Sequence, residues 1–122
     1  MGLDTSHGCW HGAYSAFQRW RGTLMRVAYQ RDIMSMQGFG GKTPWSSLGK
    51  DPLIVLLNHS DCDGIIKAKD CAPLADRLEK LLPALRSEGD GGGHIGSYEE
   101  KTRQFINGLR LAASRNEDVD FH

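Results

Sequence analysis

The chain has 122 residues, of which 39% are hydrophobic and 25% charged, and 15 Lys+Arg balance 15 Asp+Glu. This is the composition of one soluble domain, large enough to bury a core without disulfides or an obligatory metal. A net charge of zero excludes the broad positive field that drives nonspecific nucleic-acid binding. Apolar runs are too short for a membrane span, so we expect a cytoplasmic protein. Three cysteines, an odd number, predict free thiols or metal ligands.

The first predicted element is a helix over residues 10–30, followed by a long loop over residues 32–50. Apolar residues recur in the helix at spacings of three and four, which predicts one aromatic face. These residues are Trp10, Tyr14, Phe17, Trp20, Leu24 and Ala28. The loop is predicted from its glycine, serine and proline content.

The second predicted unit is a helix-loop-helix over residues 51–86. Asp51 and Pro52 supply a cap and a first-turn proline for a short apolar segment, residues 53–58. That segment suits a helix or a buried strand, and we favour the helix. A leucine stripe after the loop predicts a longer helix that ends near Ser87.

The last predicted helix covers residues 97–115. Residues 89–93 are almost all glycine and predict a flexible connector before it. Ser97 and Glu100 form a capping box at its start. The whole pattern predicts a mainly α fold: one small helical domain spanning residues 1–122, with long glycine-rich loops and room for a short β segment.

The loop over residues 59–70 carries the most specific motif. It resembles the twelve-residue loop of an EF-hand, in which oxygen ligands stand at the first, third, fifth and twelfth places and a glycine at the sixth. Asp61, Asp63 and Gly64 stand at the third, fifth and sixth places. The resemblance implies a helix-loop-helix over residues 51–86 and a divalent cation in the loop.

Two departures from the EF-hand pattern argue against calcium. His59 puts a nitrogen at the first place, and Asp70 is shorter than the glutamate that usually closes the loop. The alternative interpretation is a tight turn in which aspartates cap backbone amides and Gly64 adopts a positive φ.

A second cluster lies near the N-terminus, where His7, Cys9 and His11 alternate with other residues. In a helix, the two histidines would lie one turn apart and could share a metal such as zinc. The candidate metal ligands of the chain are His7, His11, His59, Asp61, Asp63 and Asp70, with Cys62 as a further candidate. The alternative is a buried cysteine beside two histidines that bind backbone groups.

Two segments also resemble a family of small proteins from bacteria and their phages whose activities are not established. These segments are the opening at residues 2–7 and the His-Ser-Asp-Cys-Asp-Gly sequence at residues 59–64. The resemblance implies a compact host or phage protein in the cytoplasm of a bacterial host cell. Some small phage proteins sequester nucleotide-derived signals of host immunity, and that analogy suggests the ligand class.

We therefore expect a noncatalytic binding protein whose ligand is a small, nucleotide-derived molecule. In this hypothesis the histidines and Arg21 bind phosphate or ribose, and Trp10 stacks on a base. The aspartates position ribose hydroxyls or fix the histidines. An aromatic stripe of this kind is also typical of a core. The candidate ligand-binding residues are Ser6, His7, Trp10, His11, Arg21, His59, Asp61 and Asp63.

Two further hypotheses remain open. The first is a metal-dependent hydrolase, phosphodiesterase-like, in which His7, His11, His59 and Asp61 hold a divalent ion and Asp63 acts as the base. The second is a structural or protein-interaction module whose helices dock a partner. Pairing of two chains through the aromatic helix face, as a homo-oligomer, is compatible with each hypothesis.

Overall fold

The computed structural model describes residues 2–87 and 98–122 and confirms a small, mainly helical fold. Its helices are α1 (Tyr14–Tyr29), α2 (Leu53–Leu57), α3 (Ala68–Arg86) and α4 (Tyr98–Ser114). Within the described residues, none of these helices combines the length and apolar character needed to cross a bilayer. The predicted connector at residues 89–93 and the capping residue Ser97 lie outside the described residues.

The N-terminal segment forms a β-hairpin where the sequence predicts the start of a helix. Strand β1 (Gly2–Asp4) pairs antiparallel with β2 (His11–Ala13), with Leu3 opposite Gly12. The helix therefore begins at Tyr14, and the prediction of a helix from residue 10 is wrong for its first turn. Glycine weakens a helix, and pairing with β1 gives this segment backbone hydrogen bonds that periodicity alone does not reveal.

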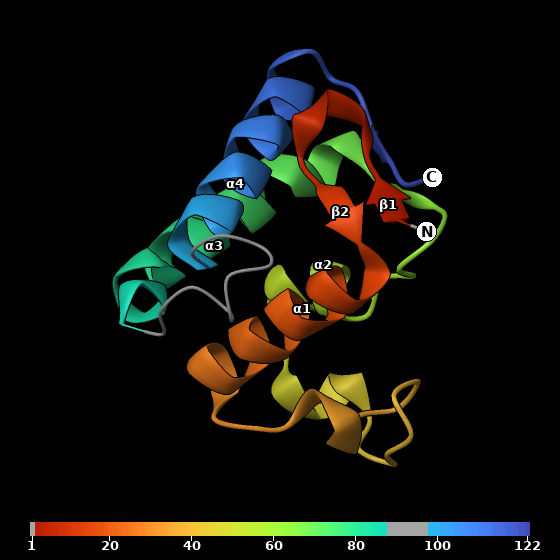
Figure 1. Cartoon of the computed structure of the whole chain (residues 1–122), viewed down its shortest axis with the longest axis vertical. Coiled ribbons are helices and arrows are strands. Elements are labelled where there is room, and N and C mark those ends of the chain that lie inside the picture. The colour runs from red at the N-terminus through yellow and green to blue at the C-terminus, as the bar shows by residue number, and fades with distance from the viewer. Residues whose placement is uncertain (1, 88–97) are drawn as a thin grey trace.

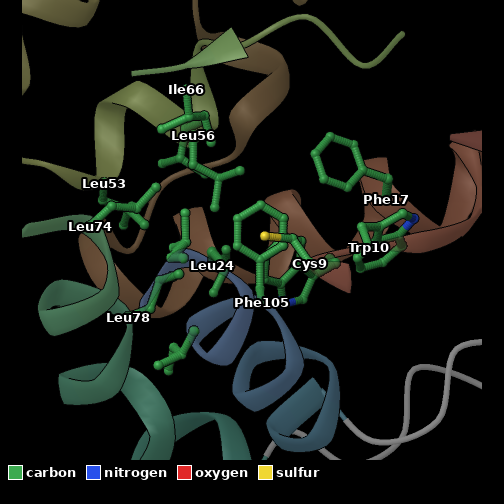
Figure 2. Close-up of a cluster of buried hydrophobic side chains, with 14 of the residues drawn as sticks. Cys9, Trp10, Phe17, Leu24, Leu53, Leu56, Ile66, Leu74, Leu78 and Phe105 are labelled. Carbon is green, nitrogen blue, oxygen red and sulfur yellow. The ribbon is translucent and has the colours of Figure 1, made fainter. Parts of the chain in front are cut away.

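Helices α3 and α4 lie side by side (Figure 1), while α1 packs against α3 and reaches α4 through the Trp20 side chain. The leucine stripe of α3 and the apolar face of α4 pack against α1 and the short α2. Figure 2 shows how side chains from these helices meet in one cluster. Fully buried members include Leu24, Leu56, Leu74, Leu78 and Phe105.

The C-terminal segment holds two distant parts of the chain together. Strand β4 (Val119–Asp120) pairs antiparallel with β3 (Ile65–Ile66), which directly precedes α3. Phe121 forms a β-bridge with Thr5 in the N-terminal segment. Both ends of the described chain consequently lie on the same side of the molecule (Figure 1).

The predicted loop after α1 contains two 3-10 turns, Ile33–Ser35 and Trp45–Leu48. Trp45 is buried and its indole Nε1 donates to Gln37 O at 2.9 Å, which anchors the segment. The short apolar segment after it is helical, as favoured from the sequence, and forms α2.

Asp51 anchors the start of α2 to its neighbours. Its carboxylate accepts hydrogen bonds from the Tyr29 hydroxyl and from Arg77 Nε, at 3.0 Å for the latter. Burial by itself would raise the pKa of Asp51, but the hydrogen bonds from Tyr29, Leu53 N and Arg77 hold it below the ordinary value. Burial and the neighbouring carboxylate raise the pKa of Tyr29. The carboxylate therefore joins α1, α2 and α3.

Candidate functional site

The acidic loop closes on its own histidine. His59 Nε2 lies 2.8 Å from Ile65 O, and Nδ1 lies 2.8 Å from Ser60 O. Ile65 stands at the seventh place of the EF-hand pattern, where a backbone carbonyl binds the ion. The imidazole thus occupies the position that a cation would take, and its ring packs against Phe121 with 4.1 Å between ring centroids.

Gly64 has the role that the tight-turn interpretation predicts. Its φ is 91°, a conformation that side chains other than glycine rarely adopt. A Cβ at this position would also lie 3.4 Å from His59 Cε1. The glycine therefore lets the loop backbone wrap closely around the imidazole.

Arg21 points from α1 into the end of α2, and its exposed fraction is only 2%. Its Nη1 donates to His59 O at 2.5 Å and to the carbonyls of Leu56 and Leu57 at 3.4 Å. These carbonyls lie at or just after the C-terminal end of α2, where backbone acceptors lack partners within the helix. Burial lowers the pKa of Arg21 to about 10, against the favourable charge of Asp61. The prediction of Arg21 as a phosphate ligand is corrected, because its guanidinium holds the loop.

The remaining acidic residues do not assemble a metal site. Asp63 and Cys62 are exposed, whereas Asp61 and Asp70 are half-buried. Across residues 2–87 and 98–122, no three side chains of His, Cys, Asp or Glu gather closely enough to hold a metal ion. The metal ligands predicted from the sequence are therefore not brought together.

The N-terminal histidines lie on different elements. His7 sits in a 3-10 turn (Ser6–Gly8) with a φ of 61°, and His11 lies in β2. The prediction that they share one helical face is wrong because the chain turns sharply between them. His11 is exposed, and its Nδ1 lies 3.2 Å from Asp4 Oδ1.

His7 belongs to a relay of hydrogen bonds with Ser6 and Glu117. The Ser6 Oγ lies 2.8 Å from His7 Nδ1, and His7 Nε2 lies 2.9 Å from Glu117 Oε1. Asp120 N donates to Ser6 Oγ at 2.8 Å. The predicted site residues Ser6 and His7 thereby fasten the C-terminal segment to the N-terminal turn.

The acidic loop and the N-terminal segment both bind the C-terminal segment. Phe121 N donates to Gly64 O at 2.9 Å on one side, and His122 N donates to Asp4 O at 2.8 Å on the other. The common pocket predicted between the two segments is accordingly replaced by a three-part backbone contact.

Trp10 is a core residue with an exposed fraction of 1%. Its ring stacks on Trp20 at a centroid distance of 5.2 Å and meets Phe17 edge-on at 5.1 Å. The prediction that a base stacks on Trp10 is corrected because this ring is buried among aromatic neighbours. Its nitrogen lies at the outer end of the ring, away from the core cluster (Figure 2).

A pocket of about 660 Å³ lies along α1, beside the start of α4. Among the described residues, its charged lining is Arg19, Arg26, Arg31 and Asp32, and Tyr98 adds an aromatic ring. Arg19 and Arg26 stand seven residues apart, so two helical turns place them on one face. That spacing is the only signal of this pocket that we find in the sequence. The predicted site did not include these arginines because the histidine and aspartate motifs are more conspicuous.

The three cysteines are free thiols, as predicted. Burial raises the pKa of Cys9 to about 12 and that of Cys71 to about 11. Both buried thiols stay protonated near neutral pH and serve as small packing residues.

No protein-family model matches the chain, and comparisons with curated proteins and with solved structures give no significant match. The function must therefore be argued from the site itself.

Proposed function

We propose that the chain is a noncatalytic binding protein for a small anionic ligand, held in the arginine-lined pocket between α1 and α4. The observation that carries the proposal is the gathering of Arg19, Arg26 and Arg31 around one hollow. Guanidinium groups match phosphate and carboxylate oxygens with paired hydrogen bonds.

The charge distribution supports this choice of ligand. The whole chain has no formal net charge, yet the described residues that line the pocket include three arginines and one aspartate, Asp32. A hollow of about 660 Å³ also lies in the usual size range of small-molecule sites.

Within the anions, we favour a nucleotide-derived ligand, the class suggested by the resemblance to phage proteins. Arginines would bind the phosphate, and Tyr98 adds an aromatic surface at the pocket wall. A nucleotide that signals host immunity, sequestered without turnover, fits a binding role of this kind. Two other polar candidates, His59 and Arg21, are engaged by the chain's own carbonyls and are not needed for this binding.

Calorimetry with cyclic nucleotides and adenine-dinucleotide derivatives tests the proposal. We expect saturable heat with at least one of them, and a large loss of affinity in the double variant Arg26→Gln with Arg31→Gln. Arg110→Gln is the matched control, because Arg110 pairs with Asp76 and Glu79 on α3. Absence of heat with every nucleotide, or equal affinity in the double variant, would refute the proposal.

A second candidate function is hydrolysis by the Ser6–His7–Glu117 relay. Its distances of 2.8 and 2.9 Å fit a nucleophile, a base and a carboxylate that orients the base. We rank it lower because Ser6 Oγ already accepts a hydrogen bond from Asp120 N. Labelling of Ser6 by a fluorophosphonate, lost in Ser6→Ala, would favour this candidate over simple binding.

A further inference from the structure

Trp10 has a buried indole N–H without a hydrogen-bond acceptor. The other two tryptophans are satisfied: Trp20 Nε1 donates to Thr102 Oγ1 at 2.9 Å, and Trp45 Nε1 donates to Gln37 O at 2.9 Å. Trp10 Nε1 has no partner among the described residues, although its side chain is almost completely buried. Buried donors of this kind are rare in native proteins and call for an acceptor.

The unpartnered indole borders a hollow of about 370 Å³ at the start of α1. A Cβ placed on Gly12 would lie 3.5 Å from Trp10 Nε1, so the missing side chain leaves space beside this nitrogen. Gly12, Ala13, Ser15 and Ala16 line the same hollow. The nitrogen is thus directed at the junction of β2 with the first turn of α1.

The first turn of α1 offers further donors on this side. Its N-cap residue is Ala13, no side chain caps the turn, and no acidic residue lies within it. The first amides of a helix lack intrahelical acceptors and carry a partial positive charge. Such a turn favours an anion when other donors converge on the same position.

Two cationic side chains complete the hollow. Lys101 reaches across from α4, with its Nζ 4.8 Å from the centroid of the Trp10 ring. Arg19 lines this hollow and also the arginine-lined pocket. The indole N–H, the first-turn amides, an ammonium and a guanidinium all favour negatively charged oxygen atoms.

We infer that this hollow, the Trp10 subsite, binds an oxyanion, either a phosphoryl or a carboxylate group. The group accepts a hydrogen bond from Trp10 Nε1 and is neutralised by Lys101 and Arg19. The inference rests on the proposed function and deepens it: because Arg19 faces both hollows, one ligand carries two anionic groups, one on either side of Arg19. Nucleotides with two phosphodiester groups or with two separate phosphates have that form.

Indole resonances of the ¹⁵N-labelled full-length chain test the Trp10 subsite directly. The three indole N–H signals are assigned with Trp→Phe variants and then followed during titration with sodium phosphate, sodium acetate and sodium chloride at matched ionic strength. We expect phosphate, acetate or both to move the Trp10 signal saturably, while those of Trp20 and Trp45 stay in place. A shift with phosphate alone assigns a phosphoryl group, and one with acetate alone assigns a carboxylate.

Two variants verify the position of the anion without loss of the indole. Gly12→Ala fits the fold, since its Cβ makes ordinary contacts, and it covers the indole edge. Lys101→Gln removes the ammonium. Each should weaken the titration about tenfold, whereas Lys80→Gln on the exposed side of α3 should not. No shift, an equal shift with chloride, or unchanged affinity in Gly12→Ala would overturn the inference.

The outcome separates the inference from the proposed function. If nucleotides bind by calorimetry but the Trp10 signal never moves, the arginine-lined pocket stands and the Trp10 subsite falls. If phosphate moves the Trp10 signal but no nucleotide binds, the subsite stands and the proposed nucleotide-binding function falls.

Discussion

The acidic loop and the Trp10 subsite are both polar regions, but they differ in whether their hydrogen-bond donors find acceptors within the chain. In the loop, His59 and the terminal nitrogens of Arg21 bind acceptors of the chain itself, although Arg21 Nε has no partner among the described residues. At the start of α1, the Trp10 indole and the first-turn amides have no side-chain partner among the described residues. The residues that are conspicuous in the sequence therefore stabilise the fold, and the inconspicuous start of α1 keeps unmet donors.

In this small domain, hydrogen-bond donors without partners indicate a ligand site better than conspicuous residue types do. A histidine among aspartates suggests chemistry, but in this chain it replaces the ion at the centre of a turn. An uncapped helix next to a glycine suggests nothing in a sequence, but it leaves donors that an external anion can satisfy. Variants of the two regions should accordingly differ: changes in the loop cost stability, and changes in the hollows cost affinity.

The largest expected effect comes from Arg21→Gln. Loss of the guanidinium leaves the carbonyls at the end of α2 without their donor and should lower the free energy of unfolding by about 3 kcal/mol. Urea denaturation measures this change. Arg26→Gln, on the exposed side of α1, is the control and should alter stability by no more than about 0.5 kcal/mol. Equal stability of the two variants would contradict the inward role of Arg21.

The next largest effect should follow His59→Ala. The variant loses hydrogen bonds within the loop and the packing on Phe121, which together are worth about 2 kcal/mol. Asp63→Ala changes an exposed side chain of the same loop, and its free energy of unfolding should stay within about 0.5 kcal/mol of that of the original chain. Comparable losses in both variants would show that the aspartate, too, supports the turn.

His59→Asp tests whether the imidazole or a cation stabilises the loop, because it places the usual EF-hand residue at the first position. If the imidazole only fills the loop, this variant is destabilised and calcium does not restore its unfolding free energy. Recovery of stability with calcium would give the EF-hand resemblance a functional meaning.

The helices themselves could be predicted from sequence because their apolar spacing repeats locally. The positions of Leu24, Leu74 and Phe105 in the core follow directly from that spacing. The start of α1 could not be predicted, since β2 depends on pairing with β1 and the apolar spacing of Trp10 and Tyr14 continues the helical pattern. Local periodicity does not report such pairing.

The candidate site was harder to predict because burial decides what each polar residue does. Arg19 and Arg21 are two residues apart on one helix, yet Arg19 is exposed and Arg21 is buried against α2. The direction of each depends on where α2 crosses α1, a tertiary property. Similarly, nothing in the sequence distinguishes the unpartnered indole of Trp10 from that of Trp20, which meets Thr102.

A smaller effect is expected for pH at Asp51, the anchor at the other end of α2. Its pKa is lowered in the folded state, so the unfolded chain binds the proton more tightly. Its contribution to stability is therefore complete above the unfolded pKa of about 3.9 and is lost as pH falls through the folded value. Urea unfolding between about pH 6 and about pH 3 should show the stability advantage over Asp51→Asn shrinking. A stability advantage that stays constant or grows as pH falls would contradict the anchoring role of Asp51.

The smallest expected effect is a gain in stability from Gly22→Ala in the wall of the arginine-lined pocket. Its Cβ would lie 3.7 Å from Ile33 Cγ2, an ordinary contact, and alanine favours the helix by about 0.8 kcal/mol. Thermal unfolding should move to a higher temperature. A loss of stability would mean that this part of α1 has less space than the structure gives it.

Native mass spectrometry of the purified chain mixed with the nucleotide panel tests the central claim most directly. The account predicts one nucleotide per chain, with the bound fraction falling sharply in the double variant Arg26→Gln with Arg31→Gln and unchanged in Arg110→Gln. A chain that stays free of every nucleotide, or that binds one equally well in all three proteins, would contradict it.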